Sequence, residues 1–589
     1  MLGCTNIIFS RYDSQSHRLT DYPAEGHTDE VFPGQDYSNP RVKDFLSVAQ
    51  YDLTLVDRNV TPRMPWHDMT VGMVGPIARD VARHFIQRWN FLKASKGMHR
   101  PTVPFLMPKG EYVAARDESS FKGTCRVQML RSSAQWSSGI EREHSIYNAY
   151  MECISKSKHF VYIENQFFIS ATTQDKLLRN KIAQALVERI KRAHAKGENY
   201  KVFIMIPLIP AFEGDLATKD AAAARNVMHF QYITISRGGN SIMEKLREAG
   251  IDPSDYIGWY SLRNWDKLVP PKKTSPPSPS PSPKPDVSPT LSSVDPPAPT
   301  TSTSPTDTST TSEKSIWDDD DRHHYVSELV YIHDKILIVD DRIVLIGSAN
   351  INDRSQLGNR DSEIAMLIED TDMVPSFMDG KEYKAAKFAH SLRMQLFKEH
   401  LGLLDFTNWE QLIKGEAKRA PNVDVDEPTE THHTNEHTTK EEIRVFESAG
   451  PDRVLEHEKR SGANPIDSTD FGTMAVRLDA KALDPLAPHC HQDIWNATAK
   501  NNTMIYRDLF RCVPDDTVHT FEQHRKFLPD PTKIPHGHVA DPDLHGREIR
   551  HRLGKVRGHL VQFPSDYLKD ENMLGSLIRE TVTPMVIFT

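Results

Sequence analysis

The segment YIHDKILIVDDRIVLIGSANIND, which begins at Tyr331, constrains the fold more than any other part of the chain. Two β-branched apolar runs, residues 336–339 and 343–346, lie on either side of a short polar stretch. Runs of this composition predict two strands of a buried sheet that are joined by a turn. Side-chain alternation places His333 and Lys335 on one face of the first strand. The second strand returns Gly347 and Ser348 to the same end.

This arrangement indicates a site for a phosphate group. A phosphate needs fixed positive charge and hydrogen-bond donors, and an imidazole can attack phosphorus or transfer a proton. We therefore predict phosphoryl-transfer chemistry. The alternative is a buried strand pair in which His333 and Lys335 only extend to the rim of the sheet. The number of residue spacings that coincide favours the phosphate site.

The sequence contains one full copy of the pattern HxKxxxxDxxxxxxGSxN, which resembles the HKD motif of the phospholipase D superfamily. Further segments resemble eukaryotic phosphatidylcholine-hydrolysing phospholipase D in the same order: RMPWHDMTVGMVGPIARDVARHFIQRWNF, IYNAYMECISKSKHFVYIENQFFIS, NINDRSQLGNRDSEIA and VTPMVIFT. The resemblance implies two pseudo-symmetric α/β lobes, each with one motif, and a catalytic centre between them. It also implies hydrolysis of phosphatidylcholine-type phosphodiesters to phosphatidate and a free alcohol through a phosphohistidine intermediate.

Only the second of the two motifs is present in this sequence. Residues 9–21, FSRYDSQSHRLTD, resemble the stretch that follows the first motif in the family, and the preceding MLGCTNII contains no His, Lys or Asp. No other histidine has a Lys two positions later and an Asp five positions beyond that Lys. We therefore expect a phospholipase D chain that is impaired by itself. The alternative is a catalytically inactive lipid-binding or regulatory fragment, or an incomplete gene model.

The resemblance assigns a role to each residue of the motif. His333 becomes the general acid that protonates the leaving alcohol, and Lys335 binds a non-bridging phosphate oxygen. Ser348 and Asn350 supply orienting hydrogen bonds. The candidate catalytic residues are His333, Lys335, Asp340, Ser348, Asn350 and Glu363.

Two of these residues have other interpretations. Asp340 is expected to support the local fold or the polar surroundings of the site. Glu363, in RDSEIA, is expected to hold a histidine in its productive tautomer, and a surface ion pair with Arg360 is the alternative.

Two further polar sets are candidate binding sites. Glu164, Asn165 and Gln166 follow the apolar run FVYI, where α/β sheets usually place ligand contacts, so we predict that they contact substrate. Alternatively, they bond backbone groups in a turn. A cluster of cations near a predicted helix end is expected to bind a phosphoinositide or an anionic membrane, with a solvated helix end as the alternative: Arg189, Lys191, Arg192, Lys196 and Lys201.

Composition limits the environment and the partners. The chain has no run of about 18 apolar residues, so any membrane contact should be peripheral. Its five cysteines are scattered without CxxC spacing, which favours a reducing cytoplasm. A net charge of −9 argues against nucleic acid as a partner. We expect a phospholipid membrane surface as partner, with no metal or other cofactor required. The resemblance adds a phosphoinositide as an activator and a regulatory small GTPase as a partner, and we do not expect a homo-oligomer.

The predicted fold class is α/β, with a layered mixed sheet and helices on both faces. Strands are expected at 127–130, 160–164, 202–206, 329–332 and 364–368, and helices at 77–91 and 177–195. The second lobe is complete in this prediction and the first is truncated. We divide the chain into a first-lobe remnant (1–122), the start of the second lobe (123–268), a disordered Pro/Ser/Thr-rich insert (269–315), the motif-bearing part (316–413), a flexible polar insert (414–462) and the C-terminal part of the second lobe (463–589).

Overall fold

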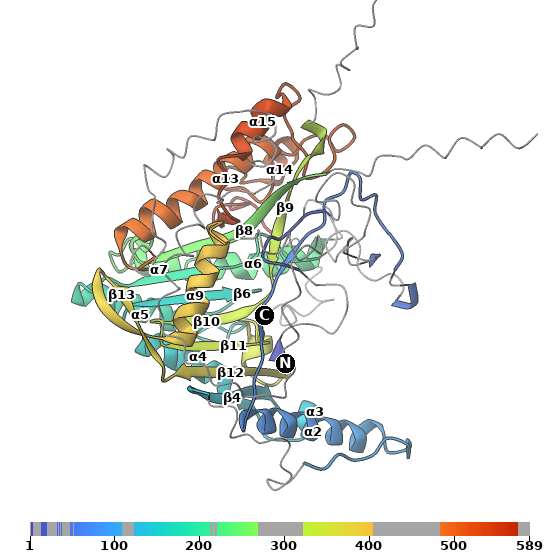
Figure 1. Ribbon diagram of the computed structural model, residues 1–589, viewed down its shortest axis with the longest axis vertical. Helices are drawn as coiled ribbons and strands as arrows, with labels where there is room; N and C mark the ends of the chain where they lie inside the picture. The colour runs from blue at the N-terminus through green and yellow to red at the C-terminus, as the bar shows by residue number, and fades with distance from the viewer. Residues whose placement is uncertain are drawn as a thin grey trace, which may run out of the picture.

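The computed structural model describes residues 2–3, 13–20, 32, 34–35, 37, 48–50, 52–108, 123–212, 216, 221–268, 322–404 and 483–574. These residues fold around a large mixed sheet (Figure 1). The inserts predicted at 269–315 and 414–462 lie outside the described residues. No helix in the described ranges is both long enough and apolar enough to cross a membrane.

Within the described residues the main sheet has 11 strands. In spatial order they are β2 (Trp66–His67), β9 (Tyr325–Ile332), β8 (Ile257–Lys267), β7 (Lys201–Met205), β6 (Phe160–Asn165), β10 (Lys335–Val339), β11 (Ile343–Gly347), β12 (Glu363–Asp370), β4 (Cys125–Ser133) and β5 (Glu143–His144), and β15 (Leu560–Gln562) pairs with β8. Strands β6, β7 and β8 are parallel to one another, whereas β10, β11, β12 and β4 form an antiparallel half. All five predicted strands are present, and the predicted mixed α/β sheet is confirmed.

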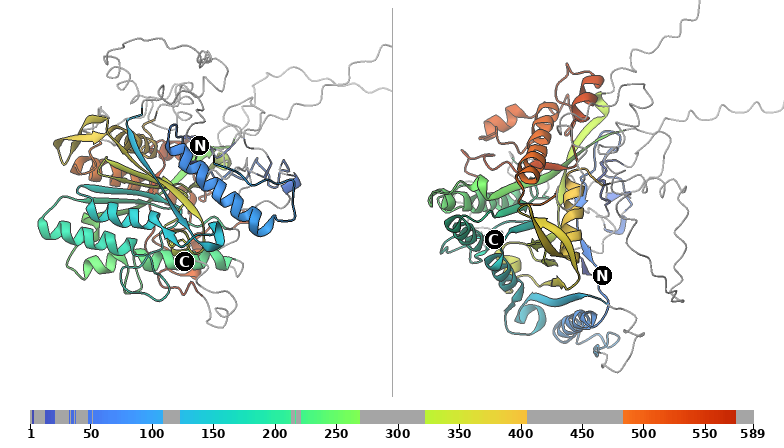
Figure 2. Two further views of the ribbon diagram at one scale, coloured as in Figure 1. Left: turned by 90° about the horizontal axis from the view of Figure 1, so that it is seen from below. Right: turned by 60° about the vertical axis from the view of Figure 1, so that its left-hand side comes forward.

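Helices cover both faces of the sheet (Figure 2). Val161 and Ile163 of β6 face one side, where they join a core with α4 (Ser145–Lys156), α5 (Ile182–Lys196), α6 (Ala222–Ile235) and α7 (Ile242–Arg247). Phe160 and Tyr162 alternate to the other side, where they pack with α9 (Lys387–His400), the π-helical segment η10 (His489–Asn496) and α13 (Ala497–Phe510). Burial on both faces explains why these strands read as continuous apolar runs.

The remaining elements lie at the margins of this sandwich. The helices are α2 (Ile77–Lys96), α3 (Gln135–Ser138), α8 (Asp353–Gln356), α14 (Phe521–Phe527) and α15 (Gly546–Leu553), with 3₁₀ turns η2 (Val48–Gln50), η5 (Pro253–Asp255) and η7 (Arg322–His324). The strands are β1 (Leu2–Gly3), β3 (Thr70–Val71), β13 (Met373–Met378) and β14 (Lys381–Ala386). Helix α2 was predicted to pack on the sheet, and Ile77 and Val81 do so, but Phe85 is 57% exposed.

The motif strand is interrupted at His333. Strand β9 ends at Ile332 and β10 begins at Lys335, so the prediction of one continuous strand through His333 is wrong. The backbone N–H groups of His333 and Asp334 both donate to the carbonyl oxygen of His67, at 2.8 and 3.2 Å. His67 belongs to β2, which lies parallel beside the end of β9. A short strand from the N-terminal region therefore holds the break in place.

Helix α5 also begins later than predicted. Its first residue is Ile182, whereas the apolar pattern suggested a start at residue 177. The Asp353 carboxylate accepts the backbone N–H groups of Arg179 and Asn180, each at 2.8 Å. These N–H groups belong to the first turn of the predicted helix, and here they donate to Asp353 instead. The predicted stop is confirmed, because Gly197 adopts a left-handed conformation with φ of 64°.

Asp340 forms the turn between β10 and β11. Asp340 and Asp341 have φ values of 54° and 49°, a conformation that Asp tolerates better than most residues. The Asp340 carboxylate accepts the backbone N–H groups of Lys158, His159 and Phe160 at 2.7, 2.7 and 2.8 Å. The turn thus anchors the start of β6.

We predict that Asp340→Ala lowers the free energy of unfolding by about 3 kcal/mol, because buried N–H groups at the start of β6 lose their acceptor. Asp340→Asn keeps one side-chain oxygen and tolerates the same backbone conformation, so its loss should be smaller. Urea denaturation followed by circular dichroism measures both. Equal losses of unfolding free energy in the two variants would contradict the role of the Asp340 side chain as a hydrogen-bond acceptor.

Candidate active site

His333 lies at the strand break, with its ring held from two sides. Its Nδ1 atom is 2.9 Å from Oδ2 of Asp68, the residue that follows His67. Its ring packs edge to face on Trp66, with 4.9 Å between the ring centroids. Only 8% of His333 is exposed. A carboxylate on one ring nitrogen fixes the tautomer and the orientation of the imidazole, which assigns proton transfer to Nε2.

Asp68 is suited to stabilise a protonated His333. Burial by itself would raise the pKa of Asp68, but the hydrogen bond from His333 and the nearby charges of His333 and Lys335 outweigh burial and lower that pKa. Sequence reasoning did not single out Asp68. The available signal was its place in RMPWHD, a segment that resembles the family. Its partner is 265 positions away, so only the fold reveals the pair.

Lys335 is fixed next to His333. Its Nζ atom donates to Oε1 of Gln166 at 3.0 Å and to the carbonyl oxygen of His333. Gln166 in turn donates to the hydroxyl of Tyr331 at 3.0 Å. The ammonium group is therefore oriented by the end of β6 and by the strand break together. This places a positive charge, an imidazole and a carboxylate within one small region.

Glu164 and Asn165 bond other groups in the interior of the fold. Both are fully buried. Glu164 accepts hydrogen bonds from Nε2 of His67 and Nε2 of His400, each at 2.7 Å. Asn165 accepts backbone N–H groups at 3.0 and 3.2 Å. The side chains of Glu164 and Asn165 are thus bonded inside the fold, Gln166 lies beside Lys335, and substrate contact by the three residues stays a prediction.

Ser348, directly after β11, and Glu363, the first residue of β12, form a second polar pair. Ser348 Oγ donates to Glu363 at 2.6 Å, and Ser355 Oγ donates to the other carboxylate oxygen at 2.7 Å. Burial raises the pKa of Glu363 to about 6, although both hydroxyl donors oppose the shift. His333 is paired with Asp68, so a histidine partner for Glu363 stays a prediction.

Gly347 serves strand packing. It lies opposite Ala365 in the β11–β12 ladder, and a Cβ atom here would come within 2.3 Å of the Ile364 carbonyl oxygen. The backbone N–H of Ser348 donates to that same oxygen at 2.9 Å. The Gly-Ser segment therefore continues the pairing of β11 with β12, and the Ser348 N–H is used in that pairing. Asn350 lies just beyond, with its side-chain oxygen buried and without a hydrogen-bond partner among the described residues.

Asp340 belongs to the other end of the strand. At about 3.3 Å per residue, it lies about 17 Å along β10 from Lys335. Its contacts fit the expected role in supporting the fold, and its place among the catalytic residues stays a prediction. The motif thus combines residues of the site with a residue of the opposite turn.

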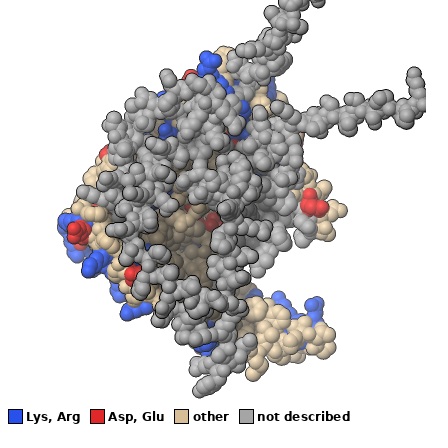
Figure 3. Space-filling view, in the orientation of Figure 1, with Lys and Arg blue, Asp and Glu red and all other residues tan. Residues whose placement is uncertain are grey.

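The basic cluster is divided by burial. Arg189 is 2% exposed and donates to the carbonyl oxygens of Ser157 and Lys158 at 2.7 and 3.0 Å, so its guanidinium is bonded inside the fold, and its role in lipid binding stays a prediction. Lys201 is half-buried and donates to the Asp255 carbonyl oxygen at 2.5 Å. Lys191, Arg192 and Lys196 stay candidates for phosphoinositide binding. On the face shown in Figure 3, basic and acidic side chains of the described residues are scattered.

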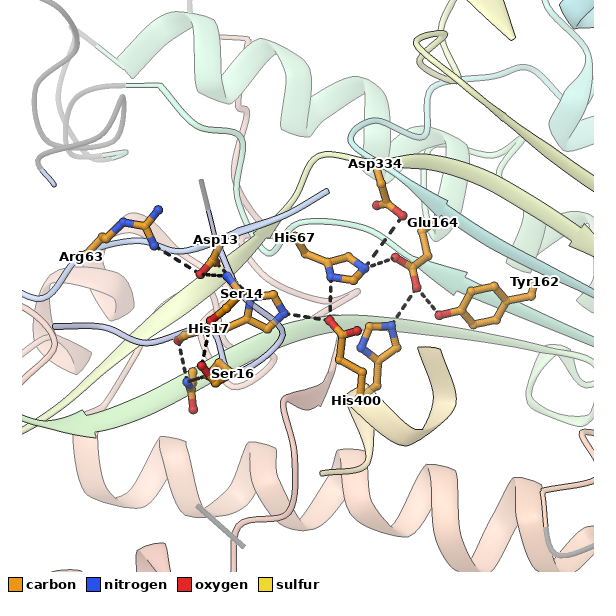
Figure 4. A network of polar contacts seen from close by, with 12 residues as sticks. Asp13, Ser14, Ser16, His17, Arg63, His67, Tyr162, Glu164, Asp334 and His400 are labelled. Atoms are coloured by element: carbon orange, nitrogen blue, oxygen red, sulfur yellow. Dashed lines mark hydrogen bonds and ion pairs between the residues drawn. The ribbon is translucent and has the colours of Figure 1, made fainter. Parts of the chain in front are cut away.

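Two buried groups of side chains have the composition of metal ligands. Among the described residues they are His17, His67 and Glu399, and His67, Glu164 and His400. Their nitrogen and oxygen atoms already bond one another (Figure 4). The arrangement is that of a hydrogen-bonded ionic network directly behind the strand break.

The chain is similar to known proteins over most of its length. A family model described as Phospholipase D matches residues 1–288 and 295–411. Human Phospholipase D1 is 35% identical over 562 residues, which cover 94% of this chain and 40% of the relative. Phospholipase D2 of Bos taurus is 33% identical over 614 residues, 100% of this chain and 51% of the relative. The chain thus spans two fifths to about half of the length of these relatives.

A solved phospholipase D family member, Nuc from Salmonella typhimurium, is also similar, with 15% identity and a TM-score of 0.19. The match covers 46% of this chain and 91% of that protein.

We predict a pH-dependent cost of burying Glu363. The folded protein holds the Glu363 proton up to about pH 6, whereas the unfolded chain loses it near 4.5. Stability is therefore lost as pH rises through this window, by up to about 2 kcal/mol. Glu363→Gln should not show this loss, so its stability relative to wild type should increase between about pH 4 and pH 7 in urea denaturation.

The exposed Glu382→Gln variant is the matched control and should follow the wild-type profile. Parallel profiles for Glu363→Gln and the wild type would contradict a raised pKa.

Proposed function

Because the chain belongs to the phospholipase D family, we propose that it acts in the hydrolysis of phospholipid phosphodiesters, with His333 as proton donor and Lys335 as phosphate ligand. The observation that carries this proposal is the Asp68–His333 hydrogen bond of 2.9 Å beside the fixed ammonium group of Lys335. Such an arrangement combines a general acid with a charge that stabilises a phosphoryl group in its transition state.

The proposed reaction uses each group at a defined step. Lys335 neutralises a non-bridging oxygen while a nucleophile attacks phosphorus and the bond to the leaving alcohol breaks. His333 gives its proton to that alcohol, and the ionised Asp68 stabilises the imidazolium before transfer. His333 then takes a proton from the water that releases the phosphoryl group. In the family scheme the nucleophile is a histidine of a first motif, and the 589 residues contain no second copy of the full pattern.

We propose a phosphatidylcholine-type substrate, with phosphatidate as product, because the relatives are phospholipases D. We also propose peripheral membrane association, phosphoinositide activation and no metal requirement. A regulatory small GTPase remains part of the same family-based proposal. The second candidate is an inactive lipid-binding or regulatory chain.

The enzyme hypothesis predicts that His333→Asn reduces turnover by about 10²- to 10⁴-fold, the usual contribution of a general acid. The measurement is choline release from phosphatidylcholine vesicles, together with transfer to a primary alcohol. His99→Asn, at an exposed histidine, is the control and should leave both rates unchanged. Turnover that persists in His333→Asn would contradict the assignment. A wild-type chain without turnover would favour the second candidate.

Membrane binding through the α5 end predicts weaker vesicle sedimentation for the double variant Arg192→Ala and Lys196→Ala. Each basic residue near an anionic surface contributes about 1 kcal/mol, so the loss should be about tenfold or more with phosphoinositide vesicles. Arg525→Ala with Lys526→Ala removes the same two charges from exposed positions of α14 and is the matched control. Equal sedimentation of the two double variants would exclude the α5 end.

A further inference from the structure

We propose that His67 is a positioning residue for His333 that acts through Asp68, and that a buried ionic network fixes it. The catalytic consequence rests on the proposed function, whereas the structural consequence can be measured without turnover. The network consists of Asp13, His17, His67, Glu164, Glu399 and His400 (Figure 4).

The backbone of His67 controls the geometry of the site. Its carbonyl oxygen accepts the N–H groups of His333 and Asp334 at 2.8 and 3.2 Å. The next residue, Asp68, supplies the carboxylate that lies 2.9 Å from the His333 ring. The two ends of the Asp68–His333 bond are therefore both tied to one peptide unit. Any displacement of His67 changes the alignment of that bond.

The side chain of His67 prevents such a displacement. Nε2 lies 2.7 Å from Oε2 of Glu164 at the end of β6, and Nδ1 lies 3.1 Å from Oε1 of Glu399 at the end of α9. Burial would lower the pKa of His67, but these two carboxylates outweigh it and raise the pKa well above the usual value. The imidazolium therefore donates from both nitrogens to two different elements. Rotation or translation of the ring breaks at least one charged hydrogen bond.

Each carboxylate has a second partner that fixes it in turn. Glu164 also accepts from His400 at 2.7 Å, and Glu399 also accepts from His17 at 3.0 Å. Burial opposes the ionised form of both carboxylates, yet their histidine partners lower both pKa values. His17 continues to Asp13 at 3.0 Å, so the network reaches the N-terminal segment.

Other titratable groups also face this network: Tyr162 donates to Glu164, and Arg63 lies 3.6 Å from Asp13. Asp334 lies 3.9 Å from His67, and burial together with the Glu164 charge raises its pKa, which favours its neutral form. The His559 ring lies 5.0 Å from that of His17, and burial lowers its pKa well below the usual value. None of these groups replaces a carboxylate partner of His67.

This arrangement favours a positional role over a gain in stability. A buried ion pair contributes little net stability, because desolvation offsets the attraction, but loss of one partner leaves an uncompensated charge. The network therefore strongly disfavours other positions of His67. A misplacement of about 1 Å in a catalytic group can reduce turnover about 10²-fold, so fixed geometry has a direct catalytic consequence.

The test is an NMR measurement on the full chain with ¹⁵N-labelled histidine. It detects the proton on His333 Nδ1 that is donated to Asp68. The signal is assigned by its loss in His333→Asn. We expect it in the wild type, and we expect it to be lost or shifted in His67→Gln and in Glu399→Gln. His559→Gln is the matched control, because His559 is buried beside His17 and forms no ion pair among the described residues. It should keep the wild-type signal.

An unchanged His333 signal in folded Glu399→Gln would overturn the inference, and this variant suffices if His67→Gln does not fold. Where the chain has turnover, a double-mutant cycle adds a second criterion. Glu399→Gln should lower kcat about tenfold with KM unchanged, and less than twofold in an Asp68→Asn background. Equal effects in both backgrounds would contradict action through Asp68. If the wild-type chain has no turnover, the proposed function is overturned, and the His333 signal alone tests the role of His67.

Discussion

The pairing of β2 with the end of β9 is the contact on which the candidate site depends. This contact is short, but His67 receives two backbone hydrogen bonds from the interrupted strand and brings Asp68 to His333. Without β2, the motif would keep its histidine and lysine but lose the carboxylate that orients the histidine. The N-terminal region is thus part of the site, even though the motif lies some 265 positions further along the chain.

The residues of the motif lie at both ends of β10. His333 and Lys335 lie at the strand break, whereas Asp340 closes the opposite turn and anchors β6. Gly347 permits the close approach of β11 and β12. A motif of this kind therefore specifies a rigid hairpin as much as a set of reacting groups. The rigidity matters because the ammonium and imidazole groups must keep a fixed separation while charge moves at phosphorus.

Charge is distributed unevenly between the interior and the surface. Carboxylates and histidines alternate behind the strand break, where each ionised group has a partner of opposite charge. The sequence pattern suggests that Arg189 is a surface cation, but its side chain is buried and donates to two backbone carbonyl oxygens. Sequence alone cannot separate such a cation from an exposed one, because helical periodicity gives the face of a residue but not the neighbour that covers that face.

Strand periodicity and motif spacing are local properties of the chain, so they were enough to predict the family and the mixed sheet and to propose His333 and Lys335 as site residues. Which polar residues meet depends on the tertiary fold. Asp68 joins His333 across the fold, Glu164 turns inward to His67, and the strand breaks at His333 because a distant carbonyl accepts its N–H group. These outcomes depend on contacts between segments that are far apart in sequence, and no local pattern contains them.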